Sequence, residues 1–448
     1  MTTCPDATTA SPHPAPSSAM SGLASRIDGQ MEKTLLEPYT YLTSTPGKNV
    51  RSMLIEAFNL WLRVPAEALE VVKEVVEMLH NSSLLIDDIQ DGSSLRRGLP
   101  AAHLIYGPAQ TINCANYVYF RALEKLLALS PEYASRCVVI YTKELCNLHR
   151  GQGMDLFWRD SVRCPSETEY LHMIDYKTGG LLRLGVKLMQ VFSSYQGNLI
   201  PLVNLIGIHF QIRDDYVNLS SSSYQKNKGY CEDITEGKFS FLISHSVRTA
   251  SDTQLLNILK QRTAESELLD YAVSCVRRTG TFAYTRRYLE RVEAAIRDEI
   301  ARQPPVDPSL LADLTAQRSR SHSQSREDFS VAPPAADAVD AAGSHSHNPA
   351  LSVIIDGLSR AYPTPKPGSA DYDLDLDVFK TMSQPCGMPG CQPASIAAQL
   401  AAGADATTSG PCASPACDGP WHEYLLLMQT AYAPGSSSSS SSSSSSTS

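Results

Sequence analysis

Apolar residues recur every three to four positions over long stretches of the chain, a spacing that predicts amphipathic helices. The stretch 66–90 shows the pattern most clearly, in Val72, Val75, Val76, Leu79, Leu85 and Ile86. Similar patterns predict helices over 25–41, 109–128, 133–158, 167–193, 251–276 and 281–302, and another after Pro201. No run alternates apolar and polar residues for long enough to predict a strand. The pattern therefore predicts an all-α fold.

The two ends of the sequence lack this pattern. Residues 1–21 and 303–448 are dominated by Ala, Ser, Pro, Thr and Gly, and residues 436–446 are all serine. Such segments bury too little apolar surface to offset the entropy cost of ordering. The expected organisation is a disordered leader at 1–21, a helical domain at 22–302, a disordered insertion at 303–347, a possible docking helix at 348–362 and a disordered low-complexity tail at 363–448.

The segment 348–362 is the exception within the C-terminal region. Its apolar residues share one helical face, and they are Leu351, Ile354, Ile355, Leu358 and Tyr362. They follow Asn348, a residue type that commonly caps helix N-termini. We expect this segment to dock on the domain as a last helix, with 308–314 as a weaker candidate for the same role.

Charge and hydropathy exclude several classes of protein. The formal net charge of −9 argues against a general nucleic-acid binder, which would carry a basic surplus. No Lys or Arg precedes Arg26 and no apolar run precedes it either, so the sequence predicts neither a secretory signal nor an Arg-rich transit peptide. The longest apolar stretch, 199–210, is interrupted by Pro201 and is too short to span a bilayer. We expect a cytoplasmic protein that is not transmembrane.

The 11 cysteines follow no disulfide framework, which favours reduced thiols. Four of them form two CxxxxC pairs in the tail, namely Cys386, Cys391, Cys412 and Cys417. This spacing is wide for a zinc ribbon, and the flanking residues are Pro, Gly and Ala. Unstructured tail cysteines are the favoured interpretation.

An acidic motif stands at the end of the most regular predicted helix. Asp87 and Asp91 are four residues apart, so they point from one helix face, and Asp88 lies at its edge. Charge beside an apolar stripe needs a partner, and Mg²⁺ bound with a diphosphate fits this arrangement. His80 lies seven residues before Asp87 and so falls on the same helix face. An ordinary acidic pair on a helix is the alternative interpretation.

A second acidic pair makes the first more informative. Asp214 and Asp215 also end an apolar helical run, so two helices each bring carboxylates to what we expect to be one cavity holding a metal cluster. Between them, the residues 177–180 place two glycines inside a predicted helix, which indicates a kink or a close backbone approach.

The ordered motifs resemble those of the all-trans short-chain prenyl diphosphate synthases, in particular the fungal and animal type of geranylgeranyl diphosphate synthase. The motifs are 47–51, 87–91 followed by 95–98, 177–180, 211–216 and 236–238. The resemblance covers about residues 22–302. It implies an isoprenoid-synthase-type helical bundle around a central apolar cavity, and a homo-oligomer that is at least a dimer.

The resemblance also implies roles for individual residues. Three Mg²⁺ per site would be held by Asp87, Asp91 and Asp214, with Asp88 and Asp215 alongside as catalytic acids. The allylic diphosphate would contact Arg96, Lys177, Thr178, Gln211, Lys228 and Lys238, of which Lys177 and Lys238 are also catalytic. Isopentenyl diphosphate would contact Lys48, Arg51, His80 and Arg97. The implied reaction extends dimethylallyl, geranyl or farnesyl diphosphate to geranylgeranyl diphosphate.

Product length depends on the depth of the cavity. Ser82 and Ser83 lie one turn before Asp87 and are small, so they leave room for a growing chain where a bulky aromatic would stop it. The resemblance implies a floor made by Tyr119, Phe120 and His149. We expect a twenty-carbon product, although ordinary core packing is an alternative for the aromatic pair.

Three other functions compete with this one. A farnesyl or mixed-length synthase would use the same mechanism. A terpene cyclase would need only one diphosphate site, which the cations Lys48, Arg51 and Arg97 argue against. A noncatalytic subunit would have lost at least one acidic motif, and both are present.

Overall fold

The structure of the protein is a computed structural model. The described residues are 29–45, 47, 49–129, 131–220, 231–307, 309–310 and 348–359. The expected leader, most of the insertion, the serine run and the tail cysteines lie outside them. So do Lys48 and Lys228 of the implied diphosphate sites.

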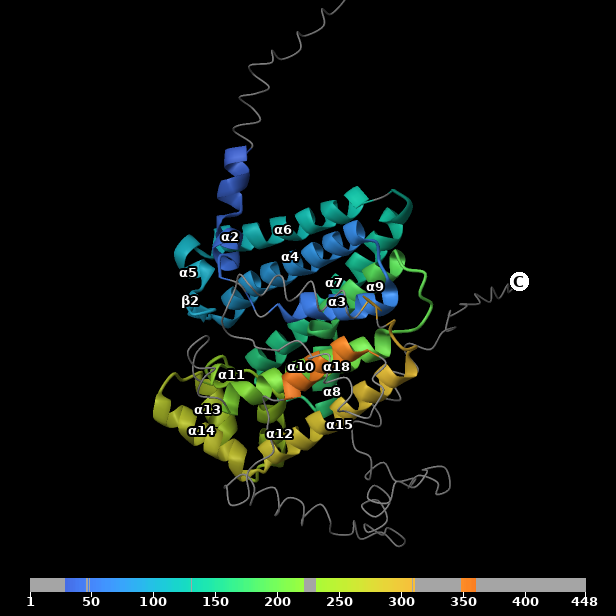
Figure 1. Ribbon diagram of the computed structural model, residues 1–448. Helices are drawn as coiled ribbons and strands as arrows, with labels where there is room; N and C mark the ends of the chain where they lie inside the picture. Colours follow the sequence, from blue (N-terminus) through green and yellow to red (C-terminus); the bar gives the residue numbers. More distant parts are fainter. Residues whose placement is uncertain are drawn as a thin grey trace, which may run out of the picture.

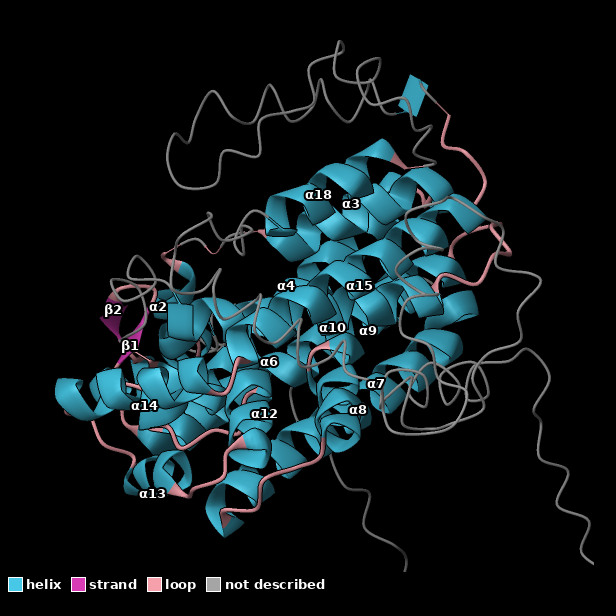
Figure 2. Cartoon of the chain, turned by 90° about the horizontal axis from the view of Figure 1, so that it is seen from below, coloured by secondary structure: helices cyan, strands magenta, loops and turns pink. Residues whose placement is uncertain are grey.

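The body is a bundle of helices, as the hydrophobic pattern predicts (Figure 1). In chain order the helices are α2 (Glu37–Thr43), α3 (Val50–Leu62), α4 (Ala66–Asp91), α5 (Ala102–Tyr106), α6 (Pro108–Leu129), α7 (Pro131–Ser161), α8 (Glu167–Lys177), α9 (Gly179–Val191), α10 (Ile200–Ser220), α11 (Glu232–Thr235), α12 (Phe241–Thr249), α13 (Gln254–Gln261), α14 (Ser266–Arg278), α15 (Thr281–Arg302) and α18 (Pro349–Ser359). The strands β1 (Leu95–Arg96) and β2 (Leu99–Pro100) form a short antiparallel hairpin at the edge of the bundle, near α2 (Figure 2).

Helix α4 is central to the bundle because it packs on both α6 and α9. Its buried face contains Val72, Val75 and Leu79, which are fully buried. Each such side chain contributes about 1.5–3 kcal/mol of hydrophobic stabilisation. The helix ends at Gly92, whose φ of +69° is one that glycine adopts without strain. The acidic motif therefore occupies the last turn of a rigid core helix.

The stretch 167–193, predicted as one helix with a kink, is divided at Thr178 into α8 and α9. The glycines there permit close packing. A Cβ on Gly179 would lie 2.8 Å from Nη1 of Arg183, and a Cβ on Gly207 of α10 would lie 3.1 Å from the Cα of Gly179. The prediction of a close backbone approach is thus confirmed. This packing fixes the backbone next to Lys177, the last residue of α8.

A buried network of ion pairs lies next to the break between α8 and α9. The fully buried Arg183 donates to Asp175 (2.7 Å), to Glu144 (3.2 Å) and to the side-chain oxygen of Asn204 (2.8 Å). These partners belong to α8, α7 and α10 respectively. Buried charges are tolerated when they are paired in this way. The network therefore ties together the helices that carry the candidate site.

The sequence pattern predicts one helix over 251–276, and this prediction is wrong, because the structure has two helices there. Helix α13 ends at Gln261, the following residue Arg262 has a left-handed φ of +48°, and α14 begins at Ser266. The polar residues between the two helices are compatible with either a turn or a helix. The periodicity of the flanking apolar residues therefore does not reveal the break.

The C-terminal helix α18 packs on α3 (Figure 2). The Asn348 side chain accepts from the backbone N–H of Leu351 (3.1 Å) as a helix cap and donates to the carbonyl of Ala57 (2.9 Å). Arg297 of α15 pairs with Asp356 at 2.5 Å. None of the described helices combines the length and apolar character needed to cross a membrane.

Candidate active site

Arg96 contacts two of the three acids near the end of α4, namely Asp87 and Asp88. Asp88 is buried, and its Oδ1 accepts from Nε of Arg96 (2.7 Å), which the β1–β2 hairpin folds back over the helix. Burial raises the pKa of Asp88, and Arg96 opposes that shift. Asp87, which is half-buried, lies 3.7 Å from Nη2 of Arg96. Arg96 therefore contacts both acids from one side.

Helix α7 approaches Asp87 from the other side. Gln152 donates to Asp87 Oδ1 (3.1 Å), and Lys177 of α8 lies 3.9 Å from the same oxygen. Lys177 also donates to Asp155 of α7 at 2.6 Å. Burial alone would lower the pKa of Lys177, but Asp155 and Asp87 outweigh it and raise the pKa. Lys177 is therefore held as a cation beside the first acidic motif.

Asp91 is bracketed by two cations. Arg159 of α7 donates to its Oδ1 (2.8 Å), and Lys238 donates to its Oδ2 (3.0 Å) and to Glu236 (3.0 Å). Burial would lower the pKa of Lys238, yet Glu236 and Asp91 raise it well above its usual value. The structure thus brings the motifs 87–91, 177–180 and 236–238 to one place.

The second acidic pair splits into two environments. Asp215 is buried and accepts from Tyr170, from the backbone N–H of Phe241 (2.8 Å) and from Gln211 (2.9 Å). Burial, partly offset by these hydrogen bonds, raises the pKa of Asp215 to about 6. Asp214 is less buried and interacts electrostatically with Arg51. Of the two, only Asp214 is half-buried as Asp87 is on α4.

Gln211 links this pair to the break between α8 and α9. Its side-chain oxygen accepts from the hydroxyl of Thr178 at 2.6 Å, and its side-chain nitrogen donates to Asp215. Two residues implied in allylic diphosphate binding are thus adjacent and share one hydrogen-bonded chain.

The cations implied in isopentenyl diphosphate binding also gather. Arg51 Nη1 lies 2.9 Å from His80 Nε2. Burial and then Arg51 and Arg97 lower the pKa of His80 well below its usual value, so His80 is neutral near pH 7. Arg97 donates to the carbonyl of Thr45 (2.7 Å) and to Asn81 (2.9 Å). It therefore fixes the segment before Lys48 onto α4.

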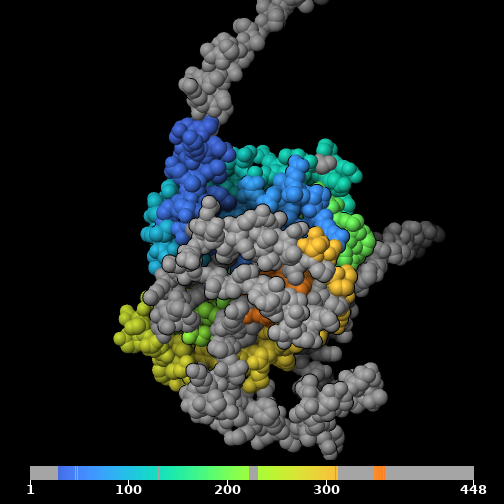
Figure 3. All heavy atoms as spheres, in the orientation of Figure 1, coloured from blue at the N-terminus to red at the C-terminus, as the bar shows by residue number. Residues whose placement is uncertain are grey.

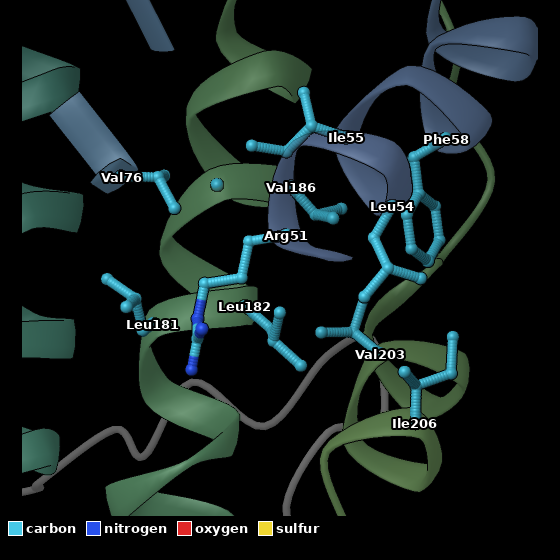
Figure 4. Close-up of a pocket in the computed structure, with 11 residues that line it drawn as sticks. Arg51, Leu54, Ile55, Phe58, Val76, Leu181, Leu182, Val186, Val203 and Ile206 are labelled. Carbon is cyan, nitrogen blue, oxygen red and sulfur yellow. The ribbon is translucent and has the colours of Figure 1, made fainter. Parts of the chain in front are cut away.

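An apolar pocket lies beside Arg51, between α3, α9 and α10 (Figure 4). Its walls include Leu54, Phe58, Leu182 and Val203. Arg51 itself lines the pocket, so a cationic group adjoins an apolar surface.

The proposed chain-length residues do not all lie together. Ser82 is buried and Ser83 half-buried, both on α4. The rings of Tyr119 and His149 meet edge to face, with centroids 6.1 Å apart. Phe120 is different, because its side chain is 68% exposed. His149 is exposed as well, so within the described residues these three side chains do not form an enclosed floor.

The donor set fits magnesium. Asp87, Asp91 and Asp214 supply only carboxylate oxygens, the hard ligands that Mg²⁺ prefers, and the Oδ2 of Asp88 is buried without a hydrogen-bond partner in the described structure. Within the described residues, no three acidic, His or Cys side chains form a ready-made metal cage. Mg²⁺ commonly binds through one or two carboxylates, waters and substrate phosphate oxygens, so such a cage is not required.

Three polar residues of α7 at the site have no role in the sequence-based prediction. Gln152, Asp155 and Arg159 are spaced by three and four, so they share one face of the helix. Each contacts an acid or cation of the predicted motifs. The sequence signal for them is this shared polar face, which does not identify their partners on α4 and α8.

Comparison with known proteins agrees with this arrangement. The model of the polyprenyl synthetase family matches residues 32–276. The chain is similar to a geranylgeranyl pyrophosphate synthase of Hypoxylon pulicicidum, with 57% identity over 262 residues, covering 58% of this chain and 67% of that protein. It is also similar to a geranylgeranyl pyrophosphate synthase of Mucor circinelloides f. lusitanicus, with 55% identity over 273 residues, covering 60% of this chain and 89% of that protein. The chain belongs to the polyprenyl synthetase family.

Proposed function

We propose that the chain is a prenyltransferase that condenses isopentenyl diphosphate with dimethylallyl, geranyl or farnesyl diphosphate and releases geranylgeranyl diphosphate. The observation that carries the proposal is the convergence of Lys177 and Lys238 on Asp87 and Asp91. Cations held beside these carboxylates would recruit both a diphosphate and the metal ions that bridge to it. The identity to geranylgeranyl pyrophosphate synthases supports the twenty-carbon product.

The residues divide into three groups by role. Asp87, Asp91 and Asp214 would hold magnesium, three ions per site. Arg96, Lys177, Thr178, Gln211, Lys228 and Lys238 would hold the allylic diphosphate. Lys48, Arg51, His80 and Arg97 would hold isopentenyl diphosphate.

Ionisation of the allylic substrate breaks its carbon–oxygen bond, and the diphosphate leaves with the electron pair. Magnesium, when bound, neutralises the charge that develops on that leaving group. Lys177 and Lys238 stabilise the same charge as fixed ammonium groups. Arg51 and neutral His80 orient the second diphosphate so that its alkene attacks the allylic carbon. A proton then passes to the released diphosphate, and the alkene is restored.

The apolar walls exclude water from the cation. Ile86 and Ile89 lie among the acids on α4, and the pocket beside Arg51 is lined by Leu54 and Val203. Water would otherwise capture the allylic cation before the alkene attacks it.

We propose that a second copy of the chain covers an apolar face on α6 and α7. Phe120 and Leu127 are exposed on one side of α6, and Val139, Met154 and Phe157 are exposed on one side of α7. Angles of 100° per residue place each set within a 90° arc, so each set lies on one side of its helix. Exposed apolar stripes of this kind mark interfaces between proteins. The helical segment that begins at residue 29 projects from the body (Figure 3), and its Glu32 pairs with Arg121 of α6.

The described cysteines form no disulfide with one another. This supports a location in the cytoplasm, where thiols stay reduced. A farnesyl diphosphate synthase is the second candidate, since only cavity depth separates it from the first. The small side chains of Ser82 and Ser83 favour the deeper cavity. The Arg51–His80 pair favours a two-diphosphate reaction over a terpene cyclase, which has one diphosphate to bind.

The test is consumption of isopentenyl diphosphate with farnesyl diphosphate and Mg²⁺. The wild-type chain should turn over, and Asp87→Ala and Asp214→Ala should not, while their helical content is retained. Asp298→Ala removes an exposed acid of α15 and serves as the matched control. Near-normal turnover in either acidic-motif variant would contradict the proposed site.

A further inference from the structure

Both carboxylate oxygens of Asp91 are already engaged by protein groups. Oδ1 accepts from Nη1 of Arg159 and Oδ2 accepts from Nζ of Lys238, at 2.8 and 3.0 Å. The Asp91 side chain is only 2% exposed. A metal ion can therefore reach this carboxylate only by sharing or displacing one of the two cations.

The two cations are not equally able to move. Lys238 lies on the loop before α12, and its ammonium group has a flexible stem that can turn to a diphosphate. Arg159 is 8% exposed, and its Nε also donates to Asp160 at 3.0 Å. A guanidinium held at both edges of its fork loses little entropy by staying where it is. Arg159 is thus the fixed partner of Asp91, and Lys238 is the exchangeable one.

Residues outside the site hold Arg159 in this position. Asp160, its second partner, also accepts from Arg262 at 2.9 Å. The Arg262 side chain lies against Gly237, where a Cβ would come within 3.1 Å of its Nε. Since Gly237 immediately precedes Lys238, the same exposed arginine adjoins both the anchor of Arg159 and the loop that carries the exchangeable lysine.

We propose that Arg159 is a positioning residue for metal loading: it fixes Asp91 through Oδ1, leaves Oδ2 as the oxygen open to exchange, and opposes binding of a divalent ion while no diphosphate is present. The inference rests on the proposed function, because it assumes that Asp91 is a metal ligand. A guanidinium next to a carboxylate disfavours a second cation there by direct repulsion. When a diphosphate draws Lys238 away, Oδ2 becomes available while Oδ1 stays held.

The test measures Mn²⁺ binding to the full chain without substrate, by the electron paramagnetic resonance signal of free Mn²⁺. Arg159→Gln should tighten Mn²⁺ binding about tenfold, the effect of removing a unit charge beside a divalent ion under water-like screening. A role confined to bracing the fold predicts the opposite sign or no change. The matched control is Arg163→Gln, which removes the same charge from an exposed arginine just after α7 that pairs with Glu169. Its Mn²⁺ affinity should stay within twofold of wild type.

Two further variants keep the inference falsifiable. Arg159→Lys retains the charge but cannot bridge Asp91 and Asp160 at once, so it should tighten Mn²⁺ binding by a smaller factor, and it carries the test if Arg159→Gln does not fold. In an Asp91→Asn background, Arg159→Gln should no longer tighten binding. Unchanged or weaker Mn²⁺ binding in folded Arg159 variants would overturn the inference alone. A wild-type chain that neither binds Mn²⁺ nor consumes isopentenyl diphosphate would overturn the proposed function instead.

Discussion

The backbone N–H of Phe241 donates a 2.8 Å hydrogen bond to Oδ2 of Asp215. Phe241 is the first residue of α12, so the carboxylate lies at a helix N-terminus, where backbone donors and the helix dipole favour negative charge. This bond ties α10 to α12 and holds Asp215 in a buried position, whereas Asp214 is half-buried. Two adjacent acids of one motif thus have separate tasks, one in packing and one in the proposed chemistry.

This division predicts different outcomes for the two acids. Asp215→Asn should lower the free energy of unfolding by about 1–3 kcal/mol, because the charged acceptor of three hydrogen bonds is lost. Asp214→Asn should leave unfolding unchanged within about 0.5 kcal/mol and lower turnover about 100-fold or more. Urea denaturation and steady-state kinetics on the same preparations check both. Equal loss of turnover with equal stability in the two variants would contradict the division.

A second prediction concerns the contact between α7 and α8. A Cβ on Gly151 would lie 2.4 Å from the backbone nitrogen of Lys177, so Gly151→Ala must push the end of α8 away from α7. We expect a loss of about 1–3 kcal/mol of stability and lower turnover, since Lys177 moves with its backbone. Gly153→Ala is the matched control, because nothing lies within 4 Å of its Cβ. That variant should gain about 0.5–1 kcal/mol from better helix propensity. Similar behaviour of the two variants would show that the packing at Gly151 is not limiting.

A third prediction concerns pH. Burial lowers the pKa of His245 to about 4, while the unfolded chain has a value near 6.5. The unfolded state therefore binds more protons between these values, and the contribution of His245 to stability falls as the pH drops from 6.5 to about 4. His245→Phe should remove up to about 2 kcal/mol of the stability difference between pH 7 and pH 5. Urea denaturation at the two pH values checks this, with the exposed His172→Gln as control. A wild-type pH dependence in His245→Phe would contradict it.

A fourth prediction addresses product length. Ser83 is half-buried on α4, one turn before Asp87, and its hydroxyl donates to the carbonyl of His80 at 2.7 Å. Ser83→Phe should fill the space beside that turn and shorten the product, as chain-length analysis would show. Ser266→Phe, at an exposed position on α14, should leave the product unchanged. A twenty-carbon product from Ser83→Phe would remove Ser83 from the determinants of depth.

Much of the helical architecture follows from the sequence because apolar spacing reports burial directly. The stretches 66–90 and 281–302 coincide closely with α4 and α15. The break at Arg262 does not follow, since it depends on a single left-handed residue in a polar segment. Helix periodicity identifies faces, but it does not identify where a face is interrupted.

The candidate site shows the same limit at the level of side chains. Motif order points to the acids of α4 and α10, and the structure brings Lys177 and Lys238 beside Asp87 and Asp91. The partners of these residues on α7 depend on how two helices are rotated about their axes, which no local pattern encodes. The separate environments of Asp214 and Asp215 likewise arise from α12, far away in the sequence.

The most direct test of the central proposal is product analysis with purified protein, Mg²⁺ and isopentenyl diphosphate, offered dimethylallyl, geranyl and farnesyl diphosphate in turn. We predict geranylgeranyl diphosphate as the end product from all three acceptors. Farnesyl diphosphate as the end point would keep the mechanism and contradict the cavity depth. A cyclised hydrocarbon, or no consumption of isopentenyl diphosphate, would contradict the synthase function itself.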